Sequence, residues 1–549
     1  MSTQSIQKTR KPFAMALLVV IVWFGITGVM GPLFGKLSSV QENNNSSFLP
    51  KGAEATKAAD VIATFSDEKT FNFPTLILFE GTSTPETFAA INAHISKVGA
   101  LTLDGTSAKI SDFLAPGAQI SVFPSQDGKA ILANIPLDGN SLSKVLPNDK
   151  PVLPELIAAL RADIAPIAKA NGLDPYVTGP GGLLGDLFGA FGDIDSKLLL
   201  TTLAVVAIIL IFVYRSPILW IIPLLSSLFA LSTAGGIVYL LAKNDIIDVD
   251  GQSQGILSVL VIGAATDYAL LLIARYREEL HLHESRFDAM KSAYKGVWEP
   301  ILASGSTVAI SLLVLLFSQL TNTAGLGPVG AIGIVCAMFT ILTLLPALLL
   351  LFGRWIFWPR RPHFDGDDHV MTGAWSKLAN GIGRNPRKAW VVTGSVLLLF
   401  AFASTTLKAD GLGTVDTFTG NPESVVGQKL LVTHFPGGEG DPTQIVVAVD
   451  KIDAVTAAVK NAPGVTQIVP FADPMTKVMK VVNNRAILNV TLDKAPDSVE
   501  ASNDIPKIRE LAKAADETSL VGGTSAVYND VRNANNRDNR TIIPIILFV

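Results

Sequence analysis

Charged residues and cysteine are both scarce in this chain of 549 residues. Asp, Glu, Lys and Arg together make up 16% of it, whereas roughly a quarter is usual for a soluble domain. The deficit is concentrated in a few long apolar stretches, which indicates that lipid rather than water surrounds them. The single cysteine, Cys336, lies inside such a stretch. No disulfide framework can therefore form, and we expect Cys336 to be a small buried apolar side chain.

Three classes of function find no support in the residues. The six histidines are scattered without the His, Cys and Asp spacing of a metal site, so we expect neither a metal nor a cofactor. The formal net charge of -4 does not favour a nucleic-acid partner. No GxxxxGK(S/T) motif occurs, which argues against nucleotide hydrolysis. The glycine-rich stretch 179–185 lacks the lysine of that motif and is interpreted as a flexible hinge.

Seven apolar runs approach or reach the roughly 20 residues that a helix needs to cross a bilayer. They are 13–34, 198–214, 217–241, 255–274, 301–320, 325–352 and 389–407. The first run is too long for a signal-peptide core and has no small-residue cleavage site, so we interpret it as an anchor. The second and third runs are separated by a tight turn at 215–217. The sequence thus predicts a polytopic α-helical membrane protein.

Basic residues predict the direction of these spans. Lys8, Arg10 and Lys11 precede the first run, which places the N-terminus in the cytoplasm of a protein of the cytoplasmic membrane. The loops after the second, fourth and sixth runs are then also cytoplasmic, and each is basic. The loop 242–254, predicted outside, is acidic. The charged stretch near 278–296 is interpreted as an amphipathic helix on the inner membrane surface, with a solvated connector as the alternative.

Two polar regions lie outside the membrane in this topology, and both predict the order β-α-β-β-α-β of a ferredoxin-like α+β domain. In the first region, strands are predicted at 74–81, 118–124, 129–136 and 174–178, and helices at 84–98 and 151–171. In the second region, strands are predicted at 443–449, 465–470, 485–492 and 518–521, helices at 451–461 and 498–515, and an extended stretch near 478–482.

The two regions also share letters, which indicates an internal repeat. VTGPGGLLGD at 177–186 corresponds to VGGTSAVYND at 521–530, and each stretch ends in an aspartate. The spacing from Phe48 to Phe65 recurs from Phe418 to Phe435. Repeated halves of this kind are frequent in secondary transporters, with the substrate route between them.

The predicted segments follow from the spans and the repeat. They are the N-terminus with helix 1 (1–36), the first outside domain (37–197), helices 2 to 6 (198–353), a cytoplasmic linker (354–388), helix 7 (389–407), the second outside domain (408–540) and the start of helix 8 (541–549). Only nine residues follow Arg540. A second half that copied the first would continue through helices 8 to 12, so we expect a C-terminally truncated piece of a protein of roughly 700 residues.

Asp267 is the ionisable residue near the middle of the fourth run. A charged side chain there costs at least ~2.5–3.5 kcal/mol on insertion scales, and such residues usually mark ion or proton pathways. Tyr268 adds a hydroxyl next to it, and the small stretch 263–265 admits a neighbouring helix. The alternative is a structural aspartate that never changes protonation. Hydroxyls in the fifth run extend a polar pathway or bond their own helix; they are Ser304, Ser306, Thr307 and Ser311.

GAATDYALLLIARYREEL at 263–280, together with FLPKGAE at 48–54 and the alternation of spans and domains, resembles the MMPL (mycobacterial membrane protein large) family of the resistance–nodulation–division superfamily. The resemblance implies proton-driven export of a lipid, glycolipid, siderophore or hydrophobic drug by two outside porter domains. It assigns Asp267 and Tyr268 to the helix-4 half of a proton relay. The matching Asp-Tyr pair is expected on helix 10, beyond residue 549.

The leading hypothesis is therefore a secondary transporter, not an enzyme, that exports a hydrophobic or amphipathic molecule at the expense of the proton gradient. Its partners would be membrane lipids and the substrate itself, and the residues do not indicate an oligomeric state. The alternative is a membrane lipid sensor or assembly factor of the same architecture that moves nothing.

Residues 1–549 by themselves are expected to export nothing, because one Asp-Tyr pair is half of the relay that the resemblance implies. Cells that carry this stretch as the only copy of the gene provide the measurement, with substrate accumulation in the medium as the readout. Export by this stretch alone would contradict the expectation.

Overall fold

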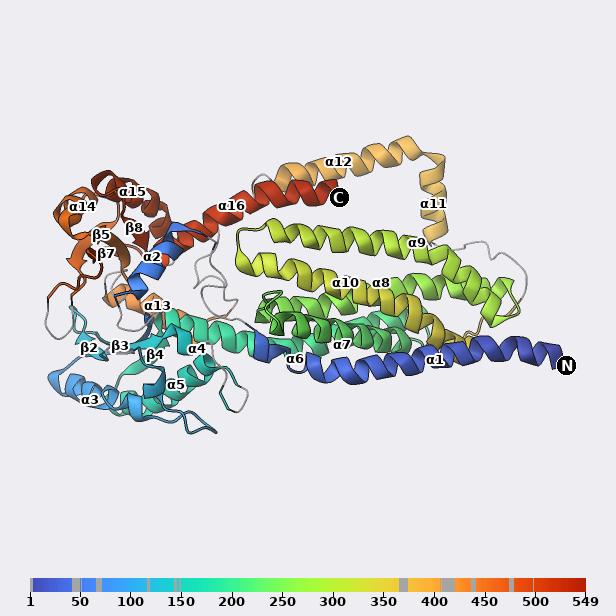
Figure 1. Cartoon of the computed structure of the whole chain (residues 1–549), viewed down its shortest axis with the longest axis horizontal. Coiled ribbons are helices and arrows are strands. Elements are labelled where there is room, and N and C mark those ends of the chain that lie inside the picture. Colours follow the sequence, from blue (N-terminus) through green and yellow to red (C-terminus); the bar gives the residue numbers. More distant parts are fainter. Residues whose placement is uncertain are drawn as a thin grey trace.

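The computed structural model of the protein describes most of the chain. The described residues are 3–41, 50, 52–65, 72–115, 119–142, 146–147, 150–364, 374–404, 406, 420–435, 441–472, 478–496 and 498–549. Figure 1 shows a long molecule with a bundle of helices at one end and two sheets with their covering helices at the other. The N-terminus lies at the end of the bundle that is far from the sheets.

Helices occupy all seven predicted apolar runs. They are α1 (Thr3–Phe34), α6 (Gly179–Tyr214), α7 (Ile221–Lys243), α8 (Gly251–Leu282), α9 (Arg286–Leu313), α10 (Thr321–Phe352) and α12 (Pro386–Ser404). Within the described residues, six of them are long and apolar enough to cross a membrane. The exception is α6, whose apolar part Leu199–Tyr214 is shorter. The chain is thus a membrane-embedded helical protein.

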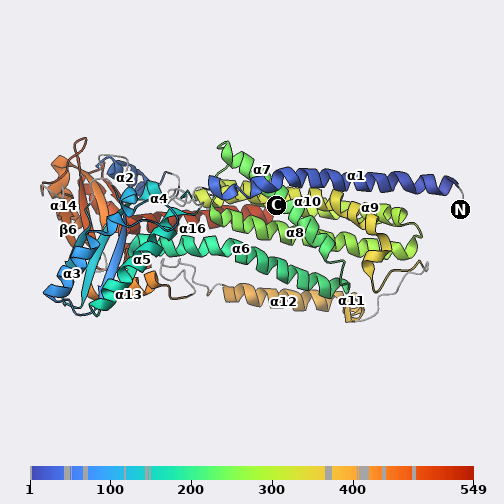
Figure 2. The same cartoon turned by 90° about the horizontal axis from the view of Figure 1, so that it is seen from below.

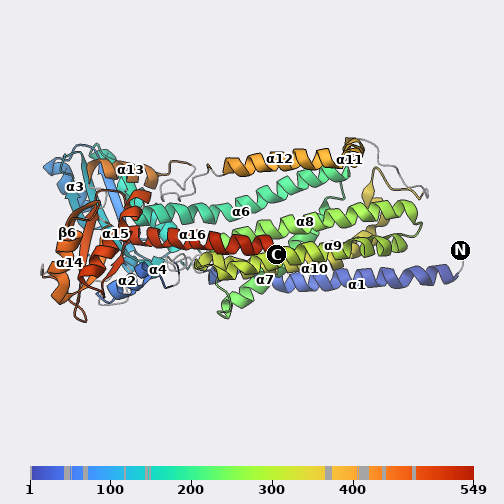
Figure 3. The same cartoon turned by 90° about the horizontal axis from the view of Figure 1, so that it is seen from above.

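The centre of the bundle consists of α7, α8 and α10. More than half of the residues in the most apolar 18-residue stretch of each helix are buried: 61% in α7, 56% in α8 and 61% in α10. Cys336 on α10 is a free, buried side chain, which confirms the interpretation made from the sequence. Figures 2 and 3 show α1 along one side of the bundle and α12 along the opposite side. None of the described side chains of α12 is buried.

The interpretation of 278–296 as a separate surface helix is wrong. Helix α8 continues to Leu282 and α9 already begins at Arg286, so the stretch belongs to the ends of two long helices. Ser285 caps α9 by accepting a hydrogen bond from the Asp288 amide. The charges in this stretch lie at the polar ends of two long helices, which the non-helical residues 283–285 separate.

The first polar region folds into a sheet with two covering helices on one face. Its strands are β1 (Asn72–Glu80), β2 (Ser121–Pro124), β3 (Ala130–Asp138) and β4 (Asp174–Thr178), and its main helices are α3 (Pro85–Ile95) and α5 (Val152–Ala170). The order along the chain is the predicted one. The order across the sheet is β2-β3-β1-β4, with every neighbouring pair antiparallel.

The second polar region repeats this arrangement. Its strands are β5 (Thr443–Ala448), β6 (Val465–Pro470), β7 (Arg485–Leu492) and β8 (Leu520–Gly522), and its helices are α14 (Ile452–Val459) and α15 (Val499–Ala515). The sheet order is β6-β7-β5-β8, again antiparallel throughout. The extended stretch near 478–482 forms only isolated bridges, from Met479 to Ala472 and from Val482 to Arg485.

Both faces of each sheet are buried, and a helix from the other half of the chain covers the second face. On β1, Ile77 and Phe79 face α3 and α5, whereas Leu76 and Leu78 face α13 (Glu423–His434). On β5, Val446 faces Phe65, which follows α2 (Glu54–Ala63). An uninterrupted apolar run is what a strand buried on both faces requires. The two halves therefore exchange one helix each.

An arginine clamp fixes the exchanged helix α13 to the first half. Arg161 on α5 donates to both carboxylate oxygens of Asp186 on α6, at 2.6 and 2.8 Å. Its Nε lies 3.2 Å from Glu423, the first residue of α13. Burial alone would raise the pKa of Asp186, but the hydrogen bonds from Arg161 and Ser424 outweigh it and hold that pKa below its usual value of 3.8. The clamp is therefore ionised throughout the neutral range.

A second clamp fixes α2 to the second half in the same way. Arg509 on α15 donates to both oxygens of Asp530, at 2.6 and 2.9 Å. Asp530 lies on α16 (Thr524–Phe548), and the Arg509 Nε lies 3.4 Å from Glu54, the first residue of α2. The amide of Ala55 donates to Asp530 at 3.0 Å. Figure 1 shows α16 running from the second sheet towards the bundle.

The repeat seen in the letters is thus a repeat in three dimensions. Asp186 and Asp530, the last residues of the matching stretches, hold the two equivalent arginines. Phe65 and Phe435 lie just after the C-terminal ends of the two exchanged helices and are both buried, while Phe48 and Phe418 lie outside the described residues. The domain boundaries drawn at 197/198 and 540/541 fall inside α6 and α16, so each sheet domain continues towards the helix bundle as one helix.

The interpretation of 179–185 as a flexible hinge is wrong, because these residues form the packed first turns of α6. A Cβ atom at Gly181 would lie 1.9 Å from Oγ1 of the buried Thr75, and one at Gly185 would lie 2.5 Å from Ile157. Glycine is used here so that α6 can lie against β1 and α5.

Replacement of Gly181 by alanine is expected to destabilise the protein by about 1–3 kcal/mol, because overpacking displaces the buried Thr75. Gly189→Ala on the same helix is the matched control, since its added Cβ would meet only Pro154 at an ordinary 3.7 Å. The measurement is the thermal unfolding midpoint of the detergent-solubilised protein. Equal midpoints for the two variants would contradict the packing role.

Candidate functional site

Helix α8 carries both predicted site residues and is fixed at both ends. At its start, Asp250 accepts a hydrogen bond from the Ser253 amide at 2.6 Å. At its end, Arg354 donates to the carbonyl oxygens of Leu280 and His283, at 2.8 and 2.7 Å. These contacts satisfy backbone and side-chain groups that a helix otherwise leaves free. Asp267 lies midway along the helix.

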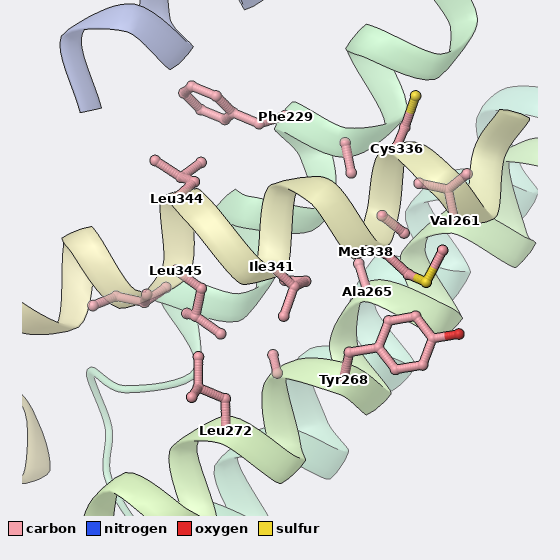
Figure 4. Close-up of a cluster of buried hydrophobic side chains, with 14 of the residues drawn as sticks. Phe229, Val261, Ala265, Tyr268, Leu272, Cys336, Met338, Ile341, Leu344 and Leu345 are labelled. Carbon is pink, nitrogen blue, oxygen red and sulfur yellow. The ribbon is translucent and has the colours of Figure 1, made fainter. Parts of the chain in front are cut away.

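Tyr268 points into the bundle. It is 3% exposed, and Figure 4 shows its ring beside Met338 of α10 with the hydroxyl directed away from the apolar cluster. The hydroxyl is near enough to the Ser304 side chain of α9 to interact with it. A buried tyrosine usually finds such a partner for its hydroxyl. Tyr268 thus links three helices, with the ring against α10 and the hydroxyl on α9.

Asp267 is exposed on a different face of α8. Consecutive residues of an α-helix are rotated by about 100°, so Asp267 cannot share the buried face of Tyr268. Within the described part of the chain, Asp267 forms no hydrogen bond and no ion pair. The carboxylate is near enough to act electrostatically on the Tyr268 hydroxyl. Asp267 and Tyr268 therefore interact electrostatically, but they form no hydrogen bond with each other in the described chain.

The small residues before Asp267 lie on two different faces of α8, one buried in the bundle and one exposed. Ala265 is fully buried, as expected for a helix contact. Gly263 is exposed, and a Cβ atom there would meet no described atom within 4 Å. The expectation that Gly263 admits a neighbouring helix is therefore not met by the described chain. The close approach lies on α10, where a Cβ atom at Gly333 would be 2.7 Å from Leu257 and Val261 of α8.

The hydroxyls of α9 continue from Tyr268 along one face. Ser304, Thr307 and Ser311 follow the i, i+3, i+7 spacing of a single helix face. Within the described residues, neither these three nor Ser306 bonds its own helix backbone, whereas Thr266 of α8 does. Beyond the end of α9, Ser318 donates to Asp538 of α16 at 2.5 Å.

Sequence reasoning missed the side chains that connect the outside domains to these helices. Asp538 accepts from Ser318 and from the Gln319 amide, so it ties α16 to the segment that follows the C-terminal end of α9. The clamps of Arg161 and Arg509 were missed as well. The aspartates at the ends of the matching stretches were a usable signal, because a charged residue repeated at equivalent places indicates a repeated contact.

Comparisons with known proteins place the chain in a family. The model of the MMPL family matches residues 47–389 and 420–549. The chain is 39% identical over 539 residues to the putative membrane protein ActII-3 of Streptomyces coelicolor, covering 97% of this chain and 71% of that protein. These matches are consistent with a membrane-embedded helical protein. The chain belongs to the MMPL family.

Two further relatives carry functional names. The apo-petrobactin exporter of Bacillus anthracis is 27% identical over 569 residues, covering 97% of this chain and 74% of that protein. The probable transport protein MmpL9 of Mycobacterium tuberculosis is 26% identical over 475 residues, covering 84% of this chain and 47% of that protein.

We expect the Tyr268 and Ser304 side chains to be coupled by about 0.5–1.5 kcal/mol of stability, the usual net value of a hydrogen bond, because the two side chains are near enough to interact. A double-mutant cycle with Tyr268→Phe and Ser304→Ala isolates it, because only coupled residues give non-additive effects. The measurement is the free energy of denaturant unfolding in detergent micelles. Ser306→Ala is the control, since no hydrogen bond of Ser306 occurs within the described chain. Additive effects of the first pair would contradict the contact.

Proposed function

We propose that the protein to which this chain belongs is a secondary transporter that exports a hydrophobic or amphipathic molecule, such as a lipid, glycolipid or drug, across the bacterial cytoplasmic membrane. The proton gradient supplies the energy, and no cofactor takes part. The observation that carries the proposal is Asp267, an ionisable side chain midway along a membrane helix and on its exposed face. Such groups mark ion and proton pathways because charge is costly in lipid.

In this proposal Asp267 binds and releases the transported proton, and Tyr268 is its partner in the relay. The neutral carboxyl tolerates apolar surroundings, whereas the carboxylate requires water or a polar partner. Protonation therefore changes which environment the open face of α8 prefers. Because α7 and α10 pack on the other faces of α8, a shift of this helix is passed on to them. The Ser304 hydroxyl extends the relay towards the hydroxyl face of α9.

We further propose that the two outside domains are ferredoxin-like porter domains and that the substrate passes between the halves. The ferredoxin-like assignment is supported by the β-α-β-β-α-β order of each domain and by the sheet orders β2-β3-β1-β4 and β6-β7-β5-β8. The proposed topology keeps the N-terminus in the cytoplasm, because Lys8, Arg10 and Lys11 precede α1's apolar part. The membrane lipids are the expected partners.

The names of two relatives support transport over the alternative of a lipid sensor or assembly factor. One relative is named an exporter and another a probable transport protein. A sensor that moves nothing has no need of a carboxyl group that titrates in the middle of the membrane. The two functions therefore differ in what the loss of the Asp267 charge does.

Replacement of Asp267 by asparagine is expected to abolish proton flux, with a reduction of at least about tenfold, because the amide has no proton to exchange. The measurement is the quenching of a pH-sensitive dye inside liposomes that contain the full-length transporter, after a pH jump. Asp245→Asn is the matched control, since Asp245 is exposed in the loop between α7 and α8 and has a left-handed backbone that asparagine tolerates.

Unchanged flux in Asp267→Asn liposomes would contradict the relay. A wild-type protein that conducts no protons, combined with unchanged export of amphipathic dyes from cells that lack the gene, would favour the sensor.

A further inference from the structure

The exchanged helices are connected to the membrane helices of the opposite half through side chains rather than through the chain itself. Helix α13 belongs to the second half by sequence, yet its partners are the first sheet and the first turns of α6. Thr178 of β4 donates to the carbonyl oxygen of Ser424, 246 residues away, at 2.8 Å. The Val177 amide donates to Glu423 at 2.7 Å.

The first clamp places α13 on the helix that contacts the site helix. Arg161 holds Asp186 in the third turn of α6, and the Ser424 hydroxyl donates to the same carboxylate at 2.5 Å. The far part of α6 packs on α8, which carries Asp267. A bidentate guanidinium–carboxylate pair fixes both distance and orientation, whereas a single contact would allow rotation. Helix α13 and α6 are thus joined at the place where α6 leaves the first sheet.

The other end of α13 is held as well. His434, the last residue of the helix, lies with Nδ1 2.7 Å from Asp127 in the hairpin between β2 and β3. Hydrogen bonds from Ser125 and His434 hold the pKa of Asp127 well below its usual value, so the carboxylate is ionised at neutral pH. Leu431 and Phe435 fill the space between the helix and the sheet.

The second clamp places α2 on the helix that contacts α9. Glu54 of α2 accepts from the Val521 amide at 3.1 Å and pairs with Arg509 and Lys513. Ala58 packs so closely on β8 that a Cβ atom at Gly522 would lie 2.8 Å from its own Cβ. Along α16, Asp538 then binds Ser318 and Gln319 at the outer end of α9, the helix that carries Ser304.

We propose that Arg161 and Arg509 are positioning residues of the transporter that keep α13 moving with α6 and α2 moving with α16 throughout the cycle. The inference depends on the proposed function, because it assigns these contacts a part in transport. When α6 moves, α13 of the second half moves with it, and when α16 moves, α2 of the first half moves with it. The two outside domains therefore move as one interlocked body. In this proposal the interface between α13 and the first sheet stays closed during the cycle, and so does the interface between α2 and the second sheet. The substrate therefore passes through neither interface.

The first test is hydrogen–deuterium exchange of the full chain in detergent micelles. Arg161→Gln is expected to speed exchange of the α13 amides by roughly tenfold, although α13 lies in the other half of the sequence. Arg509→Gln is expected to do the same for α2 and to leave α13 unchanged. Matched controls are Lys169→Gln on α5 and Lys507→Gln on α15, both exposed on the same helices as the arginines. Exchange that rises only within the mutated half would overturn the proposal.

The second test separates positioning from simple stability. An Ala58→Cys and Gly522→Cys pair joins α2 to β8 covalently in an Arg509→Gln, Cys336→Ala background. The two Cβ atoms must move apart by about 1 Å to reach the usual disulfide separation. Arg509→Gln is expected to lower dye-detected proton flux at least fivefold at a temperature well below the thermal midpoint of the variant, where the protein is folded. Oxidation of the cysteine pair is expected to restore the flux, and reduction to remove it again.

Full flux in Arg509→Gln, or loss of flux when the disulfide forms in a protein that retains Arg509, would overturn the proposal. If the wild-type protein conducts no protons at all, the proposed function fails. The hydrogen–deuterium exchange experiment then decides by itself whether each arginine holds the helix of the opposite half, because it does not depend on proton flux.

Discussion

A carboxylate facing lipid is an arrangement that a membrane protein cannot keep, and Asp267 lies on a face of α8 that the described chain leaves open. Around the rest of α8 the packing leaves no freedom, since α7 and α10 bury its other faces and side chains fix both of its ends. Only one face is therefore able to respond to a change of charge. In the proposed transporter, protonation of Asp267 therefore changes the surroundings of this one face of α8 and leaves the packed faces in contact with their neighbours.

Much of this arrangement could be predicted because the signals are local. Lipid demands long apolar runs, and a strand such as β1, apolar at Leu76, Ile77, Leu78 and Phe79, stands out from its neighbours. Asp267 was visible for the opposite reason, as a charge within an apolar run. Predictions failed where two local readings were equally good, as at 278–296, where charged residues suit a surface helix as well as the polar ends of two long ones.

The clamps lay beyond sequence reasoning because their partners are far apart in the chain. Arg161 and Glu423 are both charged residues on helices of the polar regions, and a charged side chain there is usually in contact with solvent. Only the folded chain shows that they meet. The same holds for Gly181, whose neighbour Thr75 comes more than 100 residues earlier, so that the glycine-rich stretch looked like a hinge. Repetition was the one long-range signal available, and it pointed to Asp186 and Asp530 without naming their partners.

The exchange of helices has a consequence for how the protein is made. The inner face of the first sheet, with Leu76 and Leu78, waits for a helix that is synthesised 246 residues after β4. At a translation rate of about 5–20 residues per second, that interval lasts roughly 10–50 s. During it an apolar surface stands uncovered outside the membrane while α6 to α12 are still being inserted. Biogenesis therefore requires something that shields this surface, either a chaperone outside the membrane or the lipid headgroups themselves.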